Sequence, residues 1–118
     1  MSKSVLIVDD HPSFRASARR MLEASGYAVV GEAADGAAAI AAAGELGPDL
    51  VLLDVQLPDL SGFEVAERLA ALEGNGPEVV LTSSRDRSEY GGDVEASPAR
   101  GFIPKADLSG EALAELVG

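Results

Sequence analysis

Apolar and polar residues follow one another along the chain in two kinds of pattern. Short apolar runs predict five strands, at Ser4–Val8, Tyr27–Ala33, Leu50–Leu53, Val79–Thr82 and Gly101–Pro104. Segments with apolar residues at helical spacing separate most of these runs. Because strands that alternate with helices are typical of βαβ units, we expect an α/β fold with a parallel sheet.

Three of the intervening segments and the segment after the fifth strand carry helix-start signals, at Pro12, Asp35, Ser61 and Ser109. Gly26 should close the first helix, and the second should span the alanine-rich stretch 36–46. Glu64 forms a capping-box pattern with Ser61. The last helix is expected to be short and to end at Val117.

The stretch from Ser83 to Arg100 departs from this order. The alternation predicts a fourth helix there, but Gly91-Gly92 and Pro98 interrupt it. In a helix interior, Gly costs about 1 kcal/mol and Pro about 3 kcal/mol relative to Ala. We therefore expect a short or irregular segment. Gly74-Asn75-Gly76-Pro77 should likewise break the chain before the fourth strand.

The third strand is apolar throughout Leu50–Leu53, which favours a central position with both faces covered. Asp54 ends this run. In open α/β sheets, ligands bind beyond the carboxyl ends of the strands, so Asp54 should lie at the functional edge. Pro58 and Gly62 then turn the chain away from the sheet.

Composition narrows the class of protein. The chain has 118 residues, enough for one domain over 1–118, and no apolar run long enough to cross a membrane. The absence of cysteine excludes disulfides and thiolate metal sites, which leaves oxygen ligands. The net charge of −11 disfavours direct binding to nucleic acid. The N-terminus has no secretory signal pattern, so a cytoplasmic location is expected.

Candidate chemical groups stand at the ends of the predicted strands, namely Asp9, Asp10, Asp54, Thr82 and Lys105. The three carboxylates would repel one another if bare, so removing Asp9 as Asp9→Asn should stabilise the metal-free protein. Mg²⁺ relieves such repulsion and commonly bridges carboxylates to a phosphate. A lysine and a threonine hydroxyl at the same edge could hold phosphoryl oxygens.

Together these motifs resemble a response-regulator receiver domain of two-component signalling, over essentially the whole chain. The motifs are Val-Leu-Ile-Val-Asp-Asp-His, Leu-Leu-Asp-Val-Gln-Leu-Pro, Val-Val-Leu-Thr-Ser and Phe-Ile-Pro-Lys. The resemblance implies a flavodoxin-like (βα)5 fold with a doubly wound five-stranded parallel sheet of order 2-1-3-4-5. It also implies a phosphoacceptor signalling domain of the stand-alone type, not an enzyme, although one that promotes its own phosphotransfer and dephosphorylation.

The resemblance assigns Asp54 as the phosphoacceptor, which attacks a phosphohistidine or a small phosphodonor. It implies that Asp10 and Asp54 bind Mg²⁺, or Mn²⁺, directly. The main-chain carbonyl of Gln56 would be a third protein ligand, and Asp9 would act mainly through water.

The same resemblance assigns switching roles. Lys105 would pair with Asp54 before transfer and with the phosphoryl group afterwards. Thr82 would turn toward the phosphoryl group and leave space that Phe102 fills by turning inward. Ser83 would be the small residue that keeps access open for the phosphodonor.

The partners implied are a sensor histidine kinase or a histidine phosphotransfer protein, and a downstream protein target. The domain would be a monomer or a phosphorylation-dependent homodimer, with no membrane contact. In the family, the fourth helix belongs to the surface that partners read, so the irregular stretch 86–99 leaves the target unidentified. If the chain is complete at Gly118, output would occur through a protein partner or as a phosphate sink.

Other interpretations of the same residues stay open. Asp9 and Asp10 could cap a helix, and Thr82 could be only a strand residue. Phe102 could be core, and Lys105 a solvated charge. His11, the single histidine, is interpreted as a partly exposed turn residue.

Other functions are also conceivable. A dehalogenase-like phosphatase, with an Asp nucleophile and Mg²⁺, would need a second acid where Gln56 stands. A nucleotide-binding module would want a glycine-rich loop in place of Asp9-Asp10-His11-Pro12. A receiver-like interaction module that takes no phosphoryl group is the remaining alternative, and the acidic pocket argues against it.

Overall fold

A computed structural model describes residues 3–72 and 76–117. Its sheet contains five parallel strands in the order β2-β1-β3-β4-β5. The strands are β1 (Ser4–Val8), β2 (Ala28–Ala33), β3 (Leu50–Asp54), β4 (Glu78–Ser83) and β5 (Gly101–Pro104). The predicted parallel α/β fold and its strand order are therefore confirmed.

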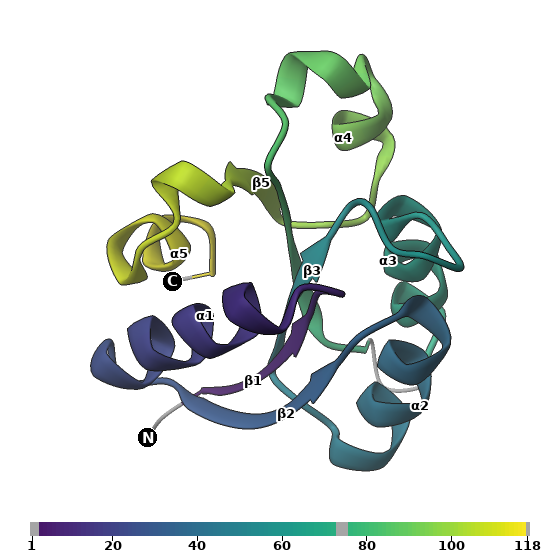
Figure 1. The fold of residues 1–118 in the computed structure, drawn as a ribbon. Coiled ribbons are helices and arrows are strands. Elements are labelled where there is room, and N and C mark those ends of the chain that lie inside the picture. Colours follow the sequence, from purple (N-terminus) through teal and green to yellow (C-terminus); the bar gives the residue numbers. More distant parts are fainter. Residues whose placement is uncertain (1–2, 73–75, 118) are drawn as a thin grey trace.

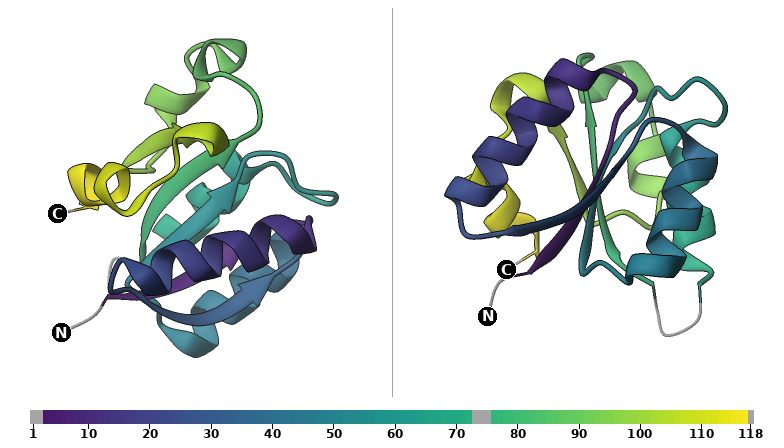
Figure 2. Two further views of the ribbon diagram at one scale, coloured as in Figure 1. Left: turned by 60° about the vertical axis from the view of Figure 1, so that its left-hand side comes forward. Right: turned by 60° about the horizontal axis from the view of Figure 1, so that its bottom comes forward.

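Helices cover both faces of the sheet. They are α1 (Pro12–Ala24), α2 (Gly36–Leu46), α3 (Gly62–Ala70), α4 (Asp93–Ala96) and α5 (Gly110–Val117), with 3-10 turns η2 (Arg87–Tyr90) and η3 (Lys105–Asp107). Helices α1 and α5 lie on one face, whereas α2, α3 and α4 lie on the other (Figures 1 and 2). No helix among residues 3–72 and 76–117 is long and apolar enough to cross a membrane.

The central strand is buried on both sides, as its apolar run predicts. Leu50 and Leu52 pack toward α1 and α5, while Val51 and Leu53 pack toward α2 and α3. All four side chains are fully buried, which contributes roughly 1.5–3 kcal/mol each relative to exposure. Their packing fixes the direction of β3 and thereby the position of Asp54 at its end.

The capping signals are largely confirmed. The side chains of Asp35, Ser61 and Ser109 each accept a hydrogen bond from the amide three residues later. Gly26 follows α1 with a φ of 93°, which a residue with a side chain rarely adopts. The capping box is only half formed, because Glu64 pairs with Arg68 at 3.5 Å.

Element ends differ slightly from the predictions. Asp54 is the last residue of β3, and β4 extends from Glu78 to Ser83. Tyr27 lies before β2, because its amide donates to the carbonyl of Leu22 in the last turn of α1 and not to a neighbouring strand. Of the predicted break before β4, Gly74 and Asn75 lie outside the described residues.

The expected irregular stretch replaces a long fourth helix. It consists of η2 and the four-residue α4, which Gly91 and Gly92 separate. Gly91 has a φ of 56° and a ψ of −132°, a conformation that no helix contains. The segment projects beyond the sheet beside β5 (Figure 1).

Candidate functional site

An acidic pocket lies where the carboxyl ends of β1, β3 and β5 meet. Val8 pairs with Leu53 in the sheet, so Asp9 and Asp54 follow neighbouring strands into the same edge. Asp9 is fully buried and Asp54 is 3% exposed, whereas Asp10 is exposed. The predicted strand-end carboxylates are thus brought together, and Lys105 joins them from the turn that follows β5.

Lys105 bridges the two buried carboxylates. Its Nζ lies 2.6 Å from Oδ2 of Asp9 and 3.2 Å from Oδ2 of Asp54. The ammonium also lies 4.3 Å from the ring centroid of Phe14, close enough for a cation–π contact. With 17% of its side chain exposed, Lys105 is a fixed part of the pocket and not a solvated surface charge.

Asp9 is held from several sides. Its Oδ1 accepts a hydrogen bond from the His11 amide at 2.8 Å, and its carbonyl accepts one from Nη1 of Arg15 at 2.6 Å. Nδ1 of His11 lies 3.0 Å from Asp9 and 3.1 Å from Asp10. Asp9 is therefore not the cap of α1, whose N-cap is His11; it is a buried ion-pair partner of Lys105.

Charge and burial act in opposite directions on the acids. Burial, together with the charge of Asp9, raises the pKa of Asp54 to about 6, even though the Gln56 amide and Lys105 favour its charged form. For Asp9, burial also acts to raise the pKa, but the hydrogen bonds from Lys105 and His11 outweigh it and the pKa is lowered.

The lysine pKa follows the same balance. Burial alone would lower the pKa of Lys105, but the hydrogen bond to Asp9 and the two nearby carboxylates raise it. Lys105 is therefore charged at neutral pH and neutralises one of the two buried acids. Lys105 thus partly compensates the expected repulsion among bare carboxylates. The repulsion that remains acts on Asp54, whose pKa is raised.

Donor atoms suitable for a hard cation converge in the pocket. Ligand atoms of Asp9, Asp10, His11 and Asp54 all lie within 4.8 Å of one another. Three of these residues offer carboxylate oxygens, which Mg²⁺ prefers, and one side is exposed for entry. The residues present therefore fit a divalent cation.

The loop after β3 is fixed to its surroundings. The amide of Gln56 donates to Oδ1 of Asp54 at 3.0 Å, and Gln56 pairs with Ser61 in an isolated bridge. A Cβ at Gly62 would collide with the carbonyl oxygen of Asp54, so only glycine permits α3 to begin this close. Asp59 accepts from the amides of Gly36 and Ala37, which ties the loop to the start of α2.

The two residues at the end of β4 point away from each other. Thr82 is fully buried, and its hydroxyl donates to the carbonyl of Ile103 at 2.7 Å. Ser83 is also buried, but its hydroxyl bonds to that of Tyr90 at 2.7 Å. Phe102 is 9% exposed and lies against Tyr90, so it is already turned inward in this structure.

Sequence reasoning missed three contributors to this region: Phe14, Arg15 and Tyr90. The sequence pattern assigns none of them a part in the site. The sequence spacing of these residues does not indicate a role, because each reaches the region from a helix or turn and its contact depends on how that element packs against the sheet.

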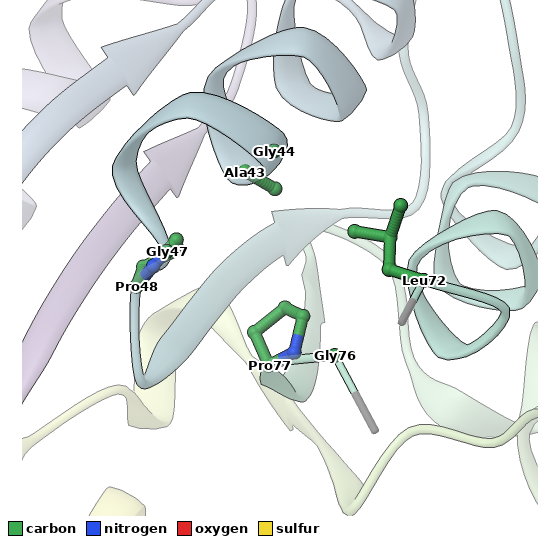
Figure 3. A pocket seen from close by; sticks show the side chains of 7 residues that line it. All are labelled: Ala43, Gly44, Gly47, Pro48, Leu72, Gly76 and Pro77. Carbon is green, nitrogen blue, oxygen red and sulfur yellow. The ribbon is translucent and has the colours of Figure 1, made fainter. Parts of the chain in front are cut away.

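A separate pocket lies at the opposite edge of the sheet. It is lined by Ala43, Gly44, Gly47, Pro48, Leu72, Gly76 and Pro77 (Figure 3). Pro48 and Pro77 stand before the amino ends of β3 and β4, whereas the acidic residues follow the carboxyl ends of strands. This pocket is therefore not part of the acidic site.

Known proteins share this sequence pattern. The family model described as the response regulator receiver domain matches residues 5–117. A Pseudomonas aeruginosa protein whose name describes a transcriptional regulator is 39% identical over 113 residues, which make up 96% of this chain and 54% of that protein. The chain spans about half the length of the curated relatives it matches.

Solved structures share the fold. A two-component response regulator of the LuxR family from Aurantimonas sp. SI85-9A1 is 29% identical, with a TM-score of 0.86, over 99% of this chain and 83% of that chain. A response regulator receiver domain protein (CheY-like) from Methanospirillum hungatei JF-1 is 27% identical, with a TM-score of 0.82, over 99% of this chain and 91% of that chain.

Proposed function

The chain belongs to the response regulator receiver domain family, and from this membership we propose that Asp54 accepts a phosphoryl group and thereby switches the domain. The carrying observation is the bridge that Lys105 forms between the buried carboxylates of Asp9 and Asp54. Such a bridge holds the acceptor carboxylate in place and supplies a cation for the incoming phosphoryl oxygens. Residues 1–118 would form one such domain.

The proposed reaction is an in-line transfer. A carboxylate oxygen of Asp54 attacks the phosphorus of a phosphohistidine, the phosphorus–nitrogen bond breaks, and the imidazole of the donor leaves with the electron pair and is protonated. Positioning and electrostatics dominate such a transfer. The hydrogen bond from the Gln56 amide leaves one oxygen of Asp54 oriented by the backbone and the other beside Lys105.

The acidic residues would hold the cation that this reaction uses. Asp10, Asp54 and the main-chain carbonyl of Gln56 are the proposed direct ligands, with Asp9 acting through water. When bound, Mg²⁺ or Mn²⁺ would neutralise the carboxylates and the phosphoryl oxygens. Lys105 would then exchange its contact with Asp54 for one with the phosphoryl group.

Thr82 is the proposed switch hydroxyl. To reach a phosphoryl group on Asp54, it must break its hydrogen bond to the carbonyl of Ile103. Asp54 and Thr82 are direct neighbours in the sheet, so the hydroxyl starts from the strand position beside the acceptor. Phe102 stands at the aromatic switch position of the family and, already buried, would fill the space that Thr82 leaves without a further inward rotation. Ser83 is the proposed small residue that keeps access open.

The proposed partners follow from this role. A histidine kinase or a histidine phosphotransfer protein would supply the phosphoryl group in the cytoplasm, and a protein target would read the switched surface. The charge of −11 disfavours direct contact of this domain with nucleic acid. The domain would act as a monomer or as a phosphorylation-dependent homodimer, and would promote its own dephosphorylation.

The test is incubation with Mg²⁺ and a small phosphodonor such as acetyl phosphate, followed by intact-mass measurement. The proposal expects the gain of one acid-labile phosphoryl group, and its loss in Asp54→Asn, which keeps the volume of the side chain but not the nucleophile. Equal labelling of Asp54→Asn would reject the acceptor. An unlabelled wild-type protein would favour an interaction module that works without phosphorylation.

A further inference from the structure

Tyr90 connects the irregular segment to the end of β4. Its hydroxyl lies 2.7 Å from that of Ser83, the residue directly after Thr82. The Ser83 hydroxyl also accepts from the amide of Arg85 at 3.1 Å. Ser83 is 1% exposed and Tyr90 is half-buried, so this pair of hydroxyls is partly shielded from water.

The ring of Tyr90 extends the connection to two further elements. It lies 5.6 Å from Phe63 in an edge-to-face arrangement with an interplanar angle of 71°. On its other side it lies 5.8 Å from Phe102 at 58°. Phe63 belongs to the first turn of α3 and Phe102 to β5, so one side chain contacts β4, α3 and β5.

Few other contacts hold this segment to the sheet. Its ion pairs, Arg85 with Glu89 and Arg87 with Glu95, are exposed and lie within the segment itself. Exposed pairs of this kind contribute little. Apart from Tyr90, the main apolar anchor within the described stretch is Val94, which lies beyond the Gly91-Gly92 break. Turn η2 therefore depends on Tyr90 for its position.

The burial of Phe102 limits which conformational change can follow phosphorylation. Because Phe102 is already turned inward, its inward rotation is not available as the step that follows phosphorylation. Thr82, by contrast, has a hydrogen bond to give up, and Ser83 is its covalent neighbour. Ser83 therefore links Thr82 to Tyr90, because it follows Thr82 in the chain and bonds to Tyr90 through its hydroxyl.

We propose that Tyr90 is a positioning residue that couples phosphorylation of Asp54 to the segment 84–99. Its hydroxyl holds Ser83 in the unphosphorylated protein, and this bond is released when Thr82 turns toward the phosphoryl group. The inference rests on the proposed function and deepens it, because it names the side chain through which the site reaches the irregular segment.

The affinity for a phosphoryl mimic tests this coupling. Tyr90→Phe keeps the ring between Phe63 and Phe102 but removes a bond that belongs to the unphosphorylated state. The variant should bind beryllofluoride with Mg²⁺ more tightly by about two- to tenfold, the range expected for one neutral hydrogen bond. Ser83→Ala should show a gain in the same range, and the double variant should gain no more than either single one.

A matched control uses the other tyrosine. Tyr27 packs with the cluster on the α1 and α5 face of the sheet, so Tyr27→Phe should leave the affinity unchanged. The chain has two tyrosines and no tryptophan, so Tyr27→Phe also makes Tyr90 the single fluorescent reporter. Its emission should change on addition of beryllofluoride and Mg²⁺, which a purely structural role of Tyr90 would not produce.

The outcomes separate this inference from the proposed function. Beryllofluoride binding with an unchanged Tyr90 emission, or with equal affinities for Tyr90→Phe and wild type, would overturn the coupling alone. Additive gains in the double variant would also overturn it, because the two hydroxyls would then act independently. A wild-type protein that neither binds beryllofluoride nor takes a phosphoryl group would reject both proposals.

Discussion

Lys105 lies closer to Asp9 than to Asp54, the acid that the family resemblance pairs with it. The two Nζ to Oδ2 distances are 2.6 Å and 3.2 Å. Asp9 is fully buried and its pKa is lowered, with Lys105 and the His11 amide opposing the effect of burial. In the metal-free pocket, Lys105 thus pairs mainly with Asp9, and the negative charge of Asp54 is less well neutralised. This asymmetry leads to the predictions on stability.

Removal of the lysine charge should destabilise the metal-free protein. Lys105→Met leaves two buried carboxylates without a cation, so we expect a loss of about 2–4 kcal/mol in the free energy of unfolding. Urea denaturation with EDTA measures it. Adding Asp9→Asn to Lys105→Met should recover part of the loss, because one of the uncompensated charges is removed. A double variant less stable than Lys105→Met would contradict this account.

Asp9 and Asp54 should respond to neutralisation with opposite signs. Asp54→Asn removes the acid whose pKa is raised, and should stabilise the metal-free protein at pH 7 by about 1–3 kcal/mol. Asp9→Asn removes the charge that pairs with Lys105 and leaves at most a neutral acceptor for the His11 amide, and should destabilise it by about 1–3 kcal/mol. Urea melts of both variants with EDTA decide between this order and equal effects.

The sign for Asp9 reverses the expectation from sequence. Spacing alone shows three acids at one edge and therefore predicts repulsion. It does not show that Lys105 Nζ reaches Asp9 or that a backbone amide bonds its other oxygen. Those contacts depend on the turn after β5 and on the loop after β1, whose geometry follows from tertiary packing.

The pH dependence of stability follows from the raised pKa of Asp54. Its folded pKa of about 6 exceeds the ordinary value of 3.8, so the folded state binds the proton more tightly. The contribution of Asp54 is then most favourable below the ordinary value and is lost as the pH rises through about 6. The stabilisation by Asp54→Asn should therefore be large at pH 7.5 and small near pH 4. Melts at both values, in EDTA, test this, and a gain that is independent of pH would argue against a raised pKa.

Much of the fold could be predicted because local signals and burial agree. The apolar run Leu50–Leu53 fixed a central strand, and Asp35 and Ser109 marked helix starts that the structure confirms. Asp9, Asp54 and Lys105 could be placed at one edge because parallel strands bring their carboxyl ends together. The position of Tyr90 could not be predicted. Tyr90 ends the turn η2 directly before Gly91-Gly92, and the packing of that turn against Phe63 is a tertiary contact that the sequence pattern does not show.

Metal dependence should separate Asp10 from its neighbours. Asp10 is exposed, so Asp10→Ala should change the stability of the metal-free protein by less than about 0.5 kcal/mol. In the wild type, addition of Mg²⁺ should raise Tm, since binding to the folded state alone stabilises it. The increase should be lost in Asp10→Ala, as should labelling by acetyl phosphate. Thermal melts across a Mg²⁺ titration measure the first effect, and an undiminished increase would exclude Asp10 as a ligand.

Hydrogen exchange should identify the segment 85–97 as the least protected part of the described chain outside its ends. Its backbone makes few internal hydrogen bonds, among them Glu89 to Asp86 and Ala96 to Gly92, and the Gly91 to Ser88 bond is long at 3.5 Å. Regions with few buried contacts open at low free energy, whereas the amides of β3 should exchange only on global unfolding.

The contribution of Tyr90 to that protection can be measured in the same experiment. Loss of one neutral hydrogen bond costs about 0.5–1.5 kcal/mol, so Tyr90→Phe should accelerate exchange at Glu89 and Gly91 by about two- to tenfold. The amides of α1 lie on the other face of the sheet and should be unaffected, which makes them the internal control. Amide exchange followed by NMR resolves the individual sites. Strong protection of 85–97 in the wild type, or equal rates in Tyr90→Phe, would show that other contacts hold this segment to the sheet.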